Sequence, residues 1–297
     1  MTWQFTLSGL LIGLLVGMTG MGGGSLLTPI LVIFFGFQPT LAVGTDVLHG
    51  AIFKSFGAVR HRRLGTVHAR LTFWMFLGSG PMSLLGVVVA TWLSHHSSGA
   101  EDIEAYAIGA APVIGGIGLV AKTFIKRGVQ PDDAPFLLTR RDRLIAFTLG
   151  AVCGFVVGLT SVGSGTFFGL VMVLVFPLTL PKIVGTDIFH AAALLWVAGF
   201  GHLVASNVDL RTMGWLLTGS IPGVLISSHF TLKVPDRALR LGLASVLMLS
   251  GIKLIDFAGA DYVIAAGVVI AGLAFAGWGF VARLGRRPRP ETAQSSD

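Results

Sequence analysis

Long apolar stretches separated by short polar segments run along almost the whole chain. A helix needs about 20 predominantly apolar residues to cross the hydrocarbon core of a bilayer, and the longer stretches approach this length. We therefore predict spanning helices over residues 41–59, 71–93, 105–125, 182–205, 212–232, 241–255 and 262–282. The pattern indicates an all-α polytopic membrane protein.

Two glycine-rich breaks interrupt the apolar pattern. The first lies between the short apolar stretches 5–18 and 26–37, and the second lies between 144–159 and 166–178. Irregular backbone at membrane depth is stable only where protein buries it or where it lines a wet cavity. Each break therefore predicts two half-length helices that form a re-entrant hairpin or a broken helix pair meeting inside the membrane; we favour the hairpin.

The same sequence pattern occurs twice, at an offset of 141 residues. The string Gly-Thr-Asp-x-x-His begins at Gly44 and again at Gly185, and Trp-x-x-x-Gly-Ser-x-Pro begins at Trp74 and again at Trp215. Such self-similarity indicates an internal duplication. We predict a first membrane repeat over 1–126, a cytoplasmic linker over 127–143, a second, inverted repeat over 144–256, one extra spanning helix over 257–283 and a disordered basic tail over 284–297.

Composition supports the membrane assignment. The chain is 53% hydrophobic and 12% charged, whereas soluble domains carry about 25% charged residues. The single cysteine, Cys153, excludes an intrachain disulfide and a thiolate metal cluster. The net charge of +7 comes from a few loops and the tail, so we interpret it as a determinant of membrane orientation and expect no nucleic-acid partner.

The distribution of basic residues predicts the orientation in the cell membrane. Lys and Arg gather in cytoplasmic loops, which assigns residues 60–70, 126–143 and 233–240 and the tail to the cytoplasm. Each repeat then contains a hairpin, which enters and leaves on the same side, and three helices that cross the membrane. Because the number of crossings is odd, the second repeat starts on the opposite side of the membrane from the first and is therefore inverted. The N-terminus is then outside and the C-terminus inside. Arg211 is the exception, because this scheme places it outside.

Inverted repeats with breaks at matching positions are typical of secondary transporters, which bind substrate near the bilayer midplane where the breaks meet. The N-terminus of a half-helix has free N–H groups and the positive end of the dipole, so it favours an anion. The alternative is that the glycines only allow close helix packing. The predicted substrate-binding residues are Gly22, Gly23, Gly24, Ser25, Thr28, Thr45, Gly163, Ser164, Gly165, Thr166, Thr186 and Lys54.

Ionisable residues inside the predicted spans need a partner or a cavity. Asp46 and Asp187 are each followed three residues later by a histidine on the same helix face, His49 and His190. Such Asp/His pairs can exchange protons, which predicts proton coupling; the alternative is a structural hydrogen bond in which the aspartate caps a half-helix. Lys54 can meet an anionic substrate or extend to the interface.

Two further histidines match across the repeats. His61 and His202 are expected at the membrane interface, since they lie at the ends of predicted spans. Trp74 and Trp215 are expected to anchor there as well.

The chain resembles the sulfite exporter family, TauE/SafE. The resemblance rests on the spaced glycines from Gly13 to Gly24, on Pro29, on the Ala-x-Gly-Thr string that ends at Thr45, and on the duplication. It implies secondary transport of small sulfur-containing anions, such as sulfite and organosulfonates, coupled to protons across the cytoplasmic membrane. Members often have a small hydroxyl residue after Gly-Thr, where this chain has Asp46 in the first half and Asp187 in the second.

Two other functions are compatible with parts of the pattern. Aspartates on two different spans also occur in intramembrane aspartyl hydrolases, which need two acids that share one proton. The Asp/His pairs could instead carry a divalent cation. We favour a transporter that is not an enzyme and has no cofactor or metal site, with the anion, protons and lipid as partners. Glycine-rich helix faces also permit a homodimer.

Overall fold

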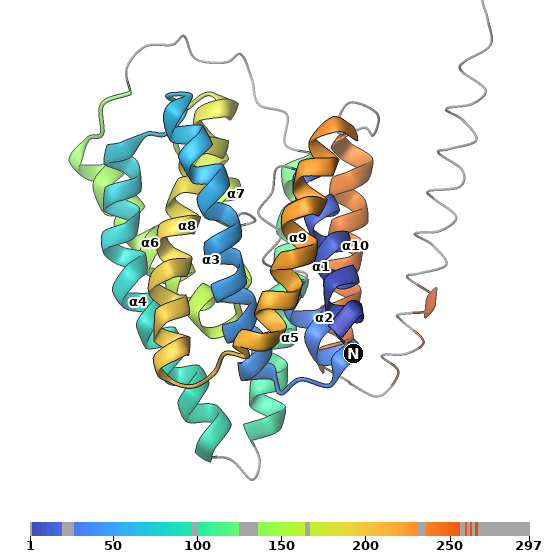
Figure 1. The fold of residues 1–297 in the computed structure, drawn as a ribbon. Helices are drawn as coiled ribbons and strands as arrows, with labels where there is room; N and C mark the ends of the chain where they lie inside the picture. The colour runs from blue at the N-terminus through green and yellow to red at the C-terminus, as the bar shows by residue number, and fades with distance from the viewer. Residues whose placement is uncertain are drawn as a thin grey trace, which may run out of the picture.

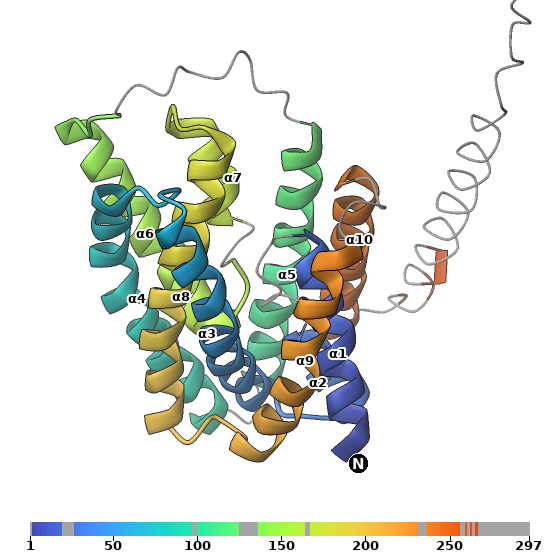
Figure 2. The same ribbon diagram turned by 45° about the horizontal axis from the view of Figure 1, so that its top comes forward.

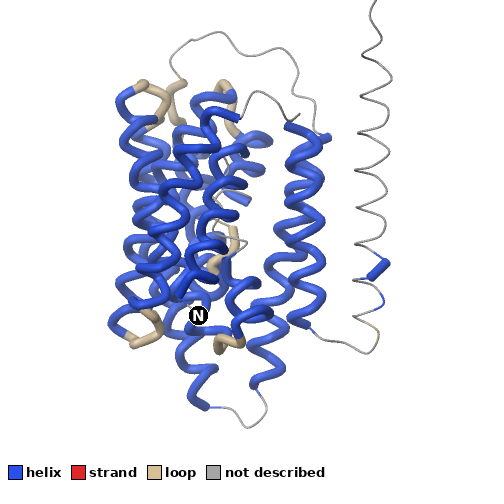
Figure 3. The backbone as a smooth tube through the Cα atoms, turned by 45° about the vertical axis from the view of Figure 1, so that its right-hand side comes forward, coloured by secondary structure: helices blue, strands red, loops and turns tan. Residues whose placement is uncertain are grey.

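The computed structural model describes residues 2–19, 27–96, 100–124, 136–163, 167–230, 236–255, 259, 262 and 265–266. Over these residues the chain forms ten α-helices and no strand (Figures 1 and 3). The helices are α1 (Thr2–Thr19), α2 (Leu27–Phe35), α3 (Pro39–Arg63), α4 (Ala69–His96), α5 (Ala100–Phe124), α6 (Arg140–Thr160), α7 (Phe167–Val175), α8 (Leu180–Val204), α9 (Leu210–Phe230) and α10 (Asp236–Ile255). The predicted span over 262–282 lies largely outside the described residues.

Three of the described helices are long and apolar enough to cross a membrane, over Ala69–His95, Arg140–Thr160 and Pro181–Val204. The shortest of them has 21 residues and is therefore about 32 Å long, close to the roughly 30 Å of a bilayer core. Large apolar side chains also point outward, such as Phe56 at 65% exposure and Val88 at 62%. An apolar exterior of this kind matches a lipid environment.

The helices that precede the glycine-rich breaks are longer than predicted. We expected half-length helices over 5–18 and 144–159, but α1 has 18 residues and α6 has 21. Helix α6 begins earlier because Thr139 caps it: its hydroxyl accepts the N–H of Asp142, and the Asp142 carboxylate accepts the N–H of Thr139. The helices after the breaks, α2 and α7, are short, with nine residues each.

The order of the helices repeats along the chain, and two of the corresponding pairs, α2/α7 and α3/α8, have equal lengths. Helices α3 and α8 both have 25 residues, and each begins at a proline-containing turn 141 residues from the other. The main packing partners come from opposite halves: α1 lies against α9, α4 against α6, α3 against α8, and α5 against α10 (Figures 1 and 2). The two halves of the chain are therefore interleaved and share one helical body.

Glycine allows two of these helix pairs to approach closely. A Cβ added at Gly150 on α6 would overlap with the carbonyl oxygen of Met75 on α4, and one added at Gly9 on α1 would overlap with that of Leu216 on α9. These contacts correspond to each other at the offset of 141. Gly78 on α4 likewise faces the backbone of α6, so it allows the same close packing.

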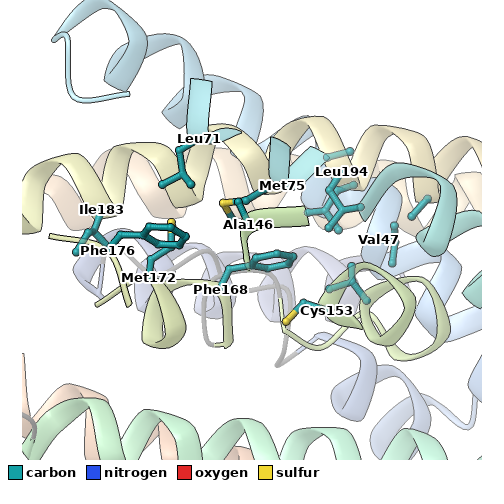
Figure 4. Close-up of a cluster of buried hydrophobic side chains, with 14 of the residues drawn as sticks. Val47, Leu71, Met75, Ala146, Cys153, Phe168, Met172, Phe176, Ile183 and Leu194 are labelled. Atoms are coloured by element: carbon teal, nitrogen blue, oxygen red, sulfur yellow. The ribbon is translucent and has the colours of Figure 1, made fainter. Parts of the chain in front are cut away.

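The larger hydrophobic core lies among α3, α4, α6, α7 and α8. Figure 4 shows Leu71, Met75, Phe168, Met172 and Phe176 gathered there. The free thiol of Cys153 is buried beside them. This core fixes α7 and the end of α6 beside the middle of α3, where the ionisable residues lie.

Candidate functional site

The carboxylate of Asp46 lies at the N-terminus of the short helix α2. Its Oδ2 accepts hydrogen bonds from the backbone N–H of Thr28 (3.2 Å) and from the hydroxyls of Thr28 and Ser161 (2.7 Å each). Asp46 is 1% exposed. A carboxylate in this position interacts with the positive end of the helix dipole and satisfies a free N–H group. The hydrogen bonds are those expected if Asp46 caps a half-helix.

Ser161 connects this arrangement to the second glycine-rich break. It follows α6 directly and has a left-handed backbone, with φ of 65°. Asp46 therefore joins α3 to the start of α2 and to the end of α6. Ser161 was not among the predicted binding residues, although it lies in the second glycine-rich break, where it corresponds to Gly20 of the first break.

The other oxygen of Asp46, Oδ1, is buried and has no hydrogen-bond partner among the described residues. An unsatisfied buried carboxylate oxygen is costly. It marks a position where a proton or a ligand donor group can bind. The capping arrangement thus uses one oxygen of Asp46 and leaves the second available.

Lys54 is buried, with 4% exposure, and lies eight residues after Asp46 on the same helix, α3. Its ammonium group interacts electrostatically with Asp187 on α8 and, more weakly, with Asp46. The interpretation that Lys54 extends to the membrane interface is therefore wrong, because the two carboxylates compensate its charge within the protein. Lys54 brings a cation to the predicted anion site.

The predicted Asp/His pairs do not form. His49 Nε2 lies 2.9 Å from the hydroxyl of Ser220 on α9, and His190 Nε2 lies 2.9 Å from that of Ser79 on α4. The hydrogen bonds of Asp46 go to other residues. Three-residue spacing places both groups on one helix face, but neighbouring helices supply serines that reach the histidines. Each histidine therefore connects a central helix to a helix of the other half.

We expect Ser79→Ala to lower the free energy of unfolding by about 1–2 kcal/mol, because it leaves a buried imidazole nitrogen unsatisfied. Ser220→Ala removes the matching bond in the other half and should have a similar effect. Ser94→Ala is the control, since that hydroxyl bonds only within α4 at an exposed position. Thermal unfolding in one detergent measures all three. Equal stability of Ser79→Ala and Ser94→Ala would contradict a role for the bond.

Thr45 and Thr186 stabilise loops in this conformation. The hydroxyl of Thr45 accepts the backbone N–H of Asp209 (3.0 Å), and that of Thr186 accepts the N–H of His68 (2.9 Å). Both threonines are fully buried. Their role in substrate binding remains a prediction, and these bonds give them a structural role at the starts of α9 and α4.

Seven of the predicted binding residues lie in the two glycine-rich breaks, outside the residues that the structure describes. Gly22, Gly23, Gly24 and Ser25 lie outside the described residues, as do Ser164, Gly165 and Thr166. Gly163 is described and buried, with φ of 121°, a backbone conformation that favours glycine. The described residues that flank the two breaks nevertheless meet at Asp46, because Thr28 and Ser161 both donate hydrogen bonds to its carboxylate.

His202, in the last turn of α8, is fully buried, and its Nε2 lies 2.9 Å from the carbonyl oxygen of Gly158 on α6. That carbonyl belongs to the last turn of α6, where helical carbonyls lack intrahelical partners. The location of His202 at the membrane interface remains a prediction. His61 is partly buried and its Nδ1 lies 2.9 Å from the hydroxyl of Thr66. Among the described residues, no group of three or more His, Cys, Asp or Glu side chains could hold a metal ion.

Comparisons with known proteins place the chain among membrane transporters. The family model described as "Sulfite exporter TauE/SafE" matches residues 5–254. The chain is 37% identical over 255 residues to the "Probable membrane transporter protein YjnA" of Bacillus subtilis (strain 168), which covers 86% of this chain and 100% of that protein. No solved structure gives a significant match.

Two more distant relatives from the same organism agree with this result. The "Probable membrane transporter protein YdhB" is 22% identical, over 82% of this chain and 96% of its own length. The "Probable membrane transporter protein YunE" is 23% identical, over 83% and 94%. The family and these relatives are transporters, not enzymes, and the apolar helices agree with a multi-pass membrane protein. The chain therefore belongs to the sulfite exporter TauE/SafE family of membrane transporters.

Proposed function

We propose that this protein is a proton-coupled secondary transporter that exports small sulfur-containing anions, such as sulfite or organosulfonates. The observation that carries the proposal is the site at the start of α2, where Asp46 accepts three hydrogen bonds beside the buried Lys54. These donors and the helix dipole suit any small oxyanion. The name of the matching family, sulfite exporter, supports the substrate class.

The charges of the site suggest why a proton accompanies the anion. The ammonium group of Lys54 interacts with two carboxylates, Asp46 and Asp187. An additional anion would be repelled if both stayed ionised. Protonation of Asp46 at its available oxygen, Oδ1, removes one negative charge and weakens the hydrogen bonds that Oδ2 accepts, so the hydroxyls of Thr28 and Ser161 can turn to the substrate. Anion binding then tightens as the pH falls, and anion and proton move together.

The arrangement of the helix ends supports an inverted repeat. Figure 2 shows the start of α6 and the connection between α3 and α4 at one end of the molecule, with the start of α1 and the connection between α8 and α9 at the other. Helices α1 and α6, which occupy the same place in the two halves, thus start from opposite ends. In our proposal each break and its flanking helices form a re-entrant hairpin, the N-terminus is outside and the C-terminus is cytoplasmic.

The same packing supports transport by alternating access. The pairs α1/α9 and α4/α6 are held together by glycine contacts with backbone, so each pair moves as a rigid unit. Among the described residues, the polar bonds between these units and the central helices α3 and α8 include those of His49, His190 and His202. Rocking of the two pairs about α3 and α8 would expose the site to each side in turn.

Efflux of sulfite from proteoliposomes tests this function. We expect an acid interior to accelerate efflux by the wild-type protein, and we expect Asp46→Asn to retain efflux without this acceleration. Asparagine can still accept the N–H of Thr28, so the change removes the proton site and preserves the cap. Asp142→Asn is the matched control, because that carboxylate caps the start of α6, at the opposite end of the helix from Ser161, and should leave the acceleration intact.

The outcomes separate the parts of the proposal. Undiminished acceleration in Asp46→Asn would refute its role in coupling. A folded protein that moves none of sulfite, thiosulfate, sulfate and sulfoacetate would refute the substrate class. In that case direct measurement of divalent-cation flux would test the cation carrier, although the described residues contain no ligand cluster for it.

A further inference from the structure

A pocket of about 530 Å³ lies where α4 and α6 begin. Arg70 and Trp74 line it from α4, Leu137 and Leu138 from the segment before α6, and Arg143 from α6 itself. The starts of α4 and α6 lie at the opposite end of the molecule from the N-terminus (Figures 1 and 2). The pocket is remote from Asp46 in the fold, because Asp46 lies beside the end of α6 and this pocket lies at its beginning.

The two arginines of the pocket have no carboxylate partner among the residues that the structure describes. The guanidinium carbon of Arg143 lies 5.8 Å from the centre of the Trp74 ring, which orients its charge against an aromatic wall. The nearest acid in sequence, Asp142, is engaged with the N–H and hydroxyl of Thr139. Among the described residues, two guanidinium groups without a carboxylate partner therefore share one cavity.

Two helix N-termini reinforce this positive charge. Helices α4 and α6 run parallel, since Met75 faces Gly150 and Ser79 faces Gly154 in register. Both helices therefore direct the positive ends of their dipoles toward the pocket. Guanidinium groups bind phosphate oxygens with paired hydrogen bonds, which makes arginine well suited to phosphate recognition.

The duplicated chain contains an internal comparison for this pocket. At the offset of 141, Arg211 and Trp215 correspond to Arg70 and Trp74, but residue 2, a threonine, corresponds to Arg143. Only one end of the molecule thus has the second arginine. A paired-arginine pocket on one side alone fits a ligand that is concentrated in one leaflet of the membrane.

We propose that this pocket binds the phosphate group of an anionic phospholipid. Both arginines are exposed at the ends of apolar helices, where lipid headgroups lie. Leu137, beside them in the pocket, is 71% exposed and offers an apolar surface to the start of an acyl chain. A free phosphate ion would gain nothing from this leucine or from the tryptophan ring, whereas a lipid uses both.

Native mass spectrometry of the full-length protein, purified in detergent, tests the proposal. We expect phosphatidylglycerol to be retained in preference to phosphatidylcholine. The double variant Arg70→Gln/Arg143→Gln should bind phosphatidylglycerol roughly 30-fold more weakly, since each arginine near an anionic membrane surface contributes roughly a fivefold gain. Arg211→Gln, the counterpart of Arg70→Gln, should bind it as the wild type does. Thermal unfolding without added lipid checks that all variants are folded.

Three results would overturn the proposal. The first is equal retention of phosphatidylglycerol by the wild type and the folded double variant. The second is an equal loss of binding in Arg211→Gln, which would indicate general attraction between charges. The third is displacement of the lipid by inorganic phosphate at millimolar concentration, which would identify the ligand as a free oxyanion.

Discussion

Replacing Lys54 with methionine is expected to lower the free energy of unfolding by about 3–5 kcal/mol, because it leaves buried carboxylates without their cation. Lys54 is 4% exposed and interacts with both Asp187 and Asp46. Methionine has a similar length and no charge, so the change removes the electrostatic interaction with little loss of packing. We expect sulfite efflux to be lost as well, because the proposed site has no other buried cation among the described residues.

A second substitution separates stability from transport. In the double variant Lys54→Met/Asp187→Asn one uncompensated charge is removed, so most of the lost stability should return, and the coupling between the two substitutions measures the interaction directly. Efflux should stay absent, because the cation for the anion is still missing. Asp187→Asn alone should be less destabilising than Lys54→Met, since the remaining Asp46 still faces Lys54.

The control for Lys54→Met is Leu195→Met, which places methionine at the corresponding position of the second half. It should be nearly neutral, since leucine and methionine have similar volumes. Unfolding in one detergent and efflux from proteoliposomes measure the whole series. Full stability of Lys54→Met would contradict the charge cluster, and wild-type efflux by this variant would contradict binding of the anion by Lys54.

Gly150→Ala is expected to cost about 3 kcal/mol, at the upper end of the range for overpacked sites. The added methyl group would overlap with the carbonyl oxygen of Met75, which belongs to the backbone of α4 and cannot rotate away. Helices α4 and α6 would have to separate along their length. Gly9→Ala creates the equivalent overlap with Leu216 between α1 and α9, so it should produce a loss of similar size.

Gly214→Ala is the matched control, because a Cβ at this position on α9 meets no other atom within 4 Å. Alanine also favours the helix over glycine by roughly 1 kcal/mol, so this variant should be as stable as the wild type or slightly more so. Unfolding temperatures in a common detergent compare the three. If Gly150→Ala proves as stable as Gly214→Ala, the close packing of α4 on α6 is contradicted.

Much of the fold could be predicted from patterns that recur along the chain. Apolar stretches of spanning length located the long helices, and the repeated strings at Gly44 and Gly185 located two helices of equal length, α3 and α8. The ends of helices were less predictable. Polar residues from Arg140 to Arg143 looked like a loop, but a capping box at Thr139 includes them in α6.

The contacts of the candidate site were harder to predict, because they join residues far apart in the chain. Spacing placed His49 on the same helix face as Asp46, yet the histidine bonds to Ser220 and the aspartate to Ser161. The repeated Trp-x-x-x-Gly-Ser-x-Pro string contained the signal for Ser220 and its counterpart, but nothing in it indicates which helix those serines face.

The sequence by itself determined that this protein is helical and embedded in a membrane, and that its two halves share a repeated pattern. The lengths of apolar stretches and the offset between repeated strings can both be read along the chain, without knowledge of which helices are in contact. The tertiary structure alone decided that Lys54 is buried between carboxylates, that Asp46 caps α2, and that the halves interleave through α1/α9 and α4/α6. The physical reason is that a buried charge or a glycine contact depends on the helix opposite, and sequence spacing describes only neighbours on the same helix.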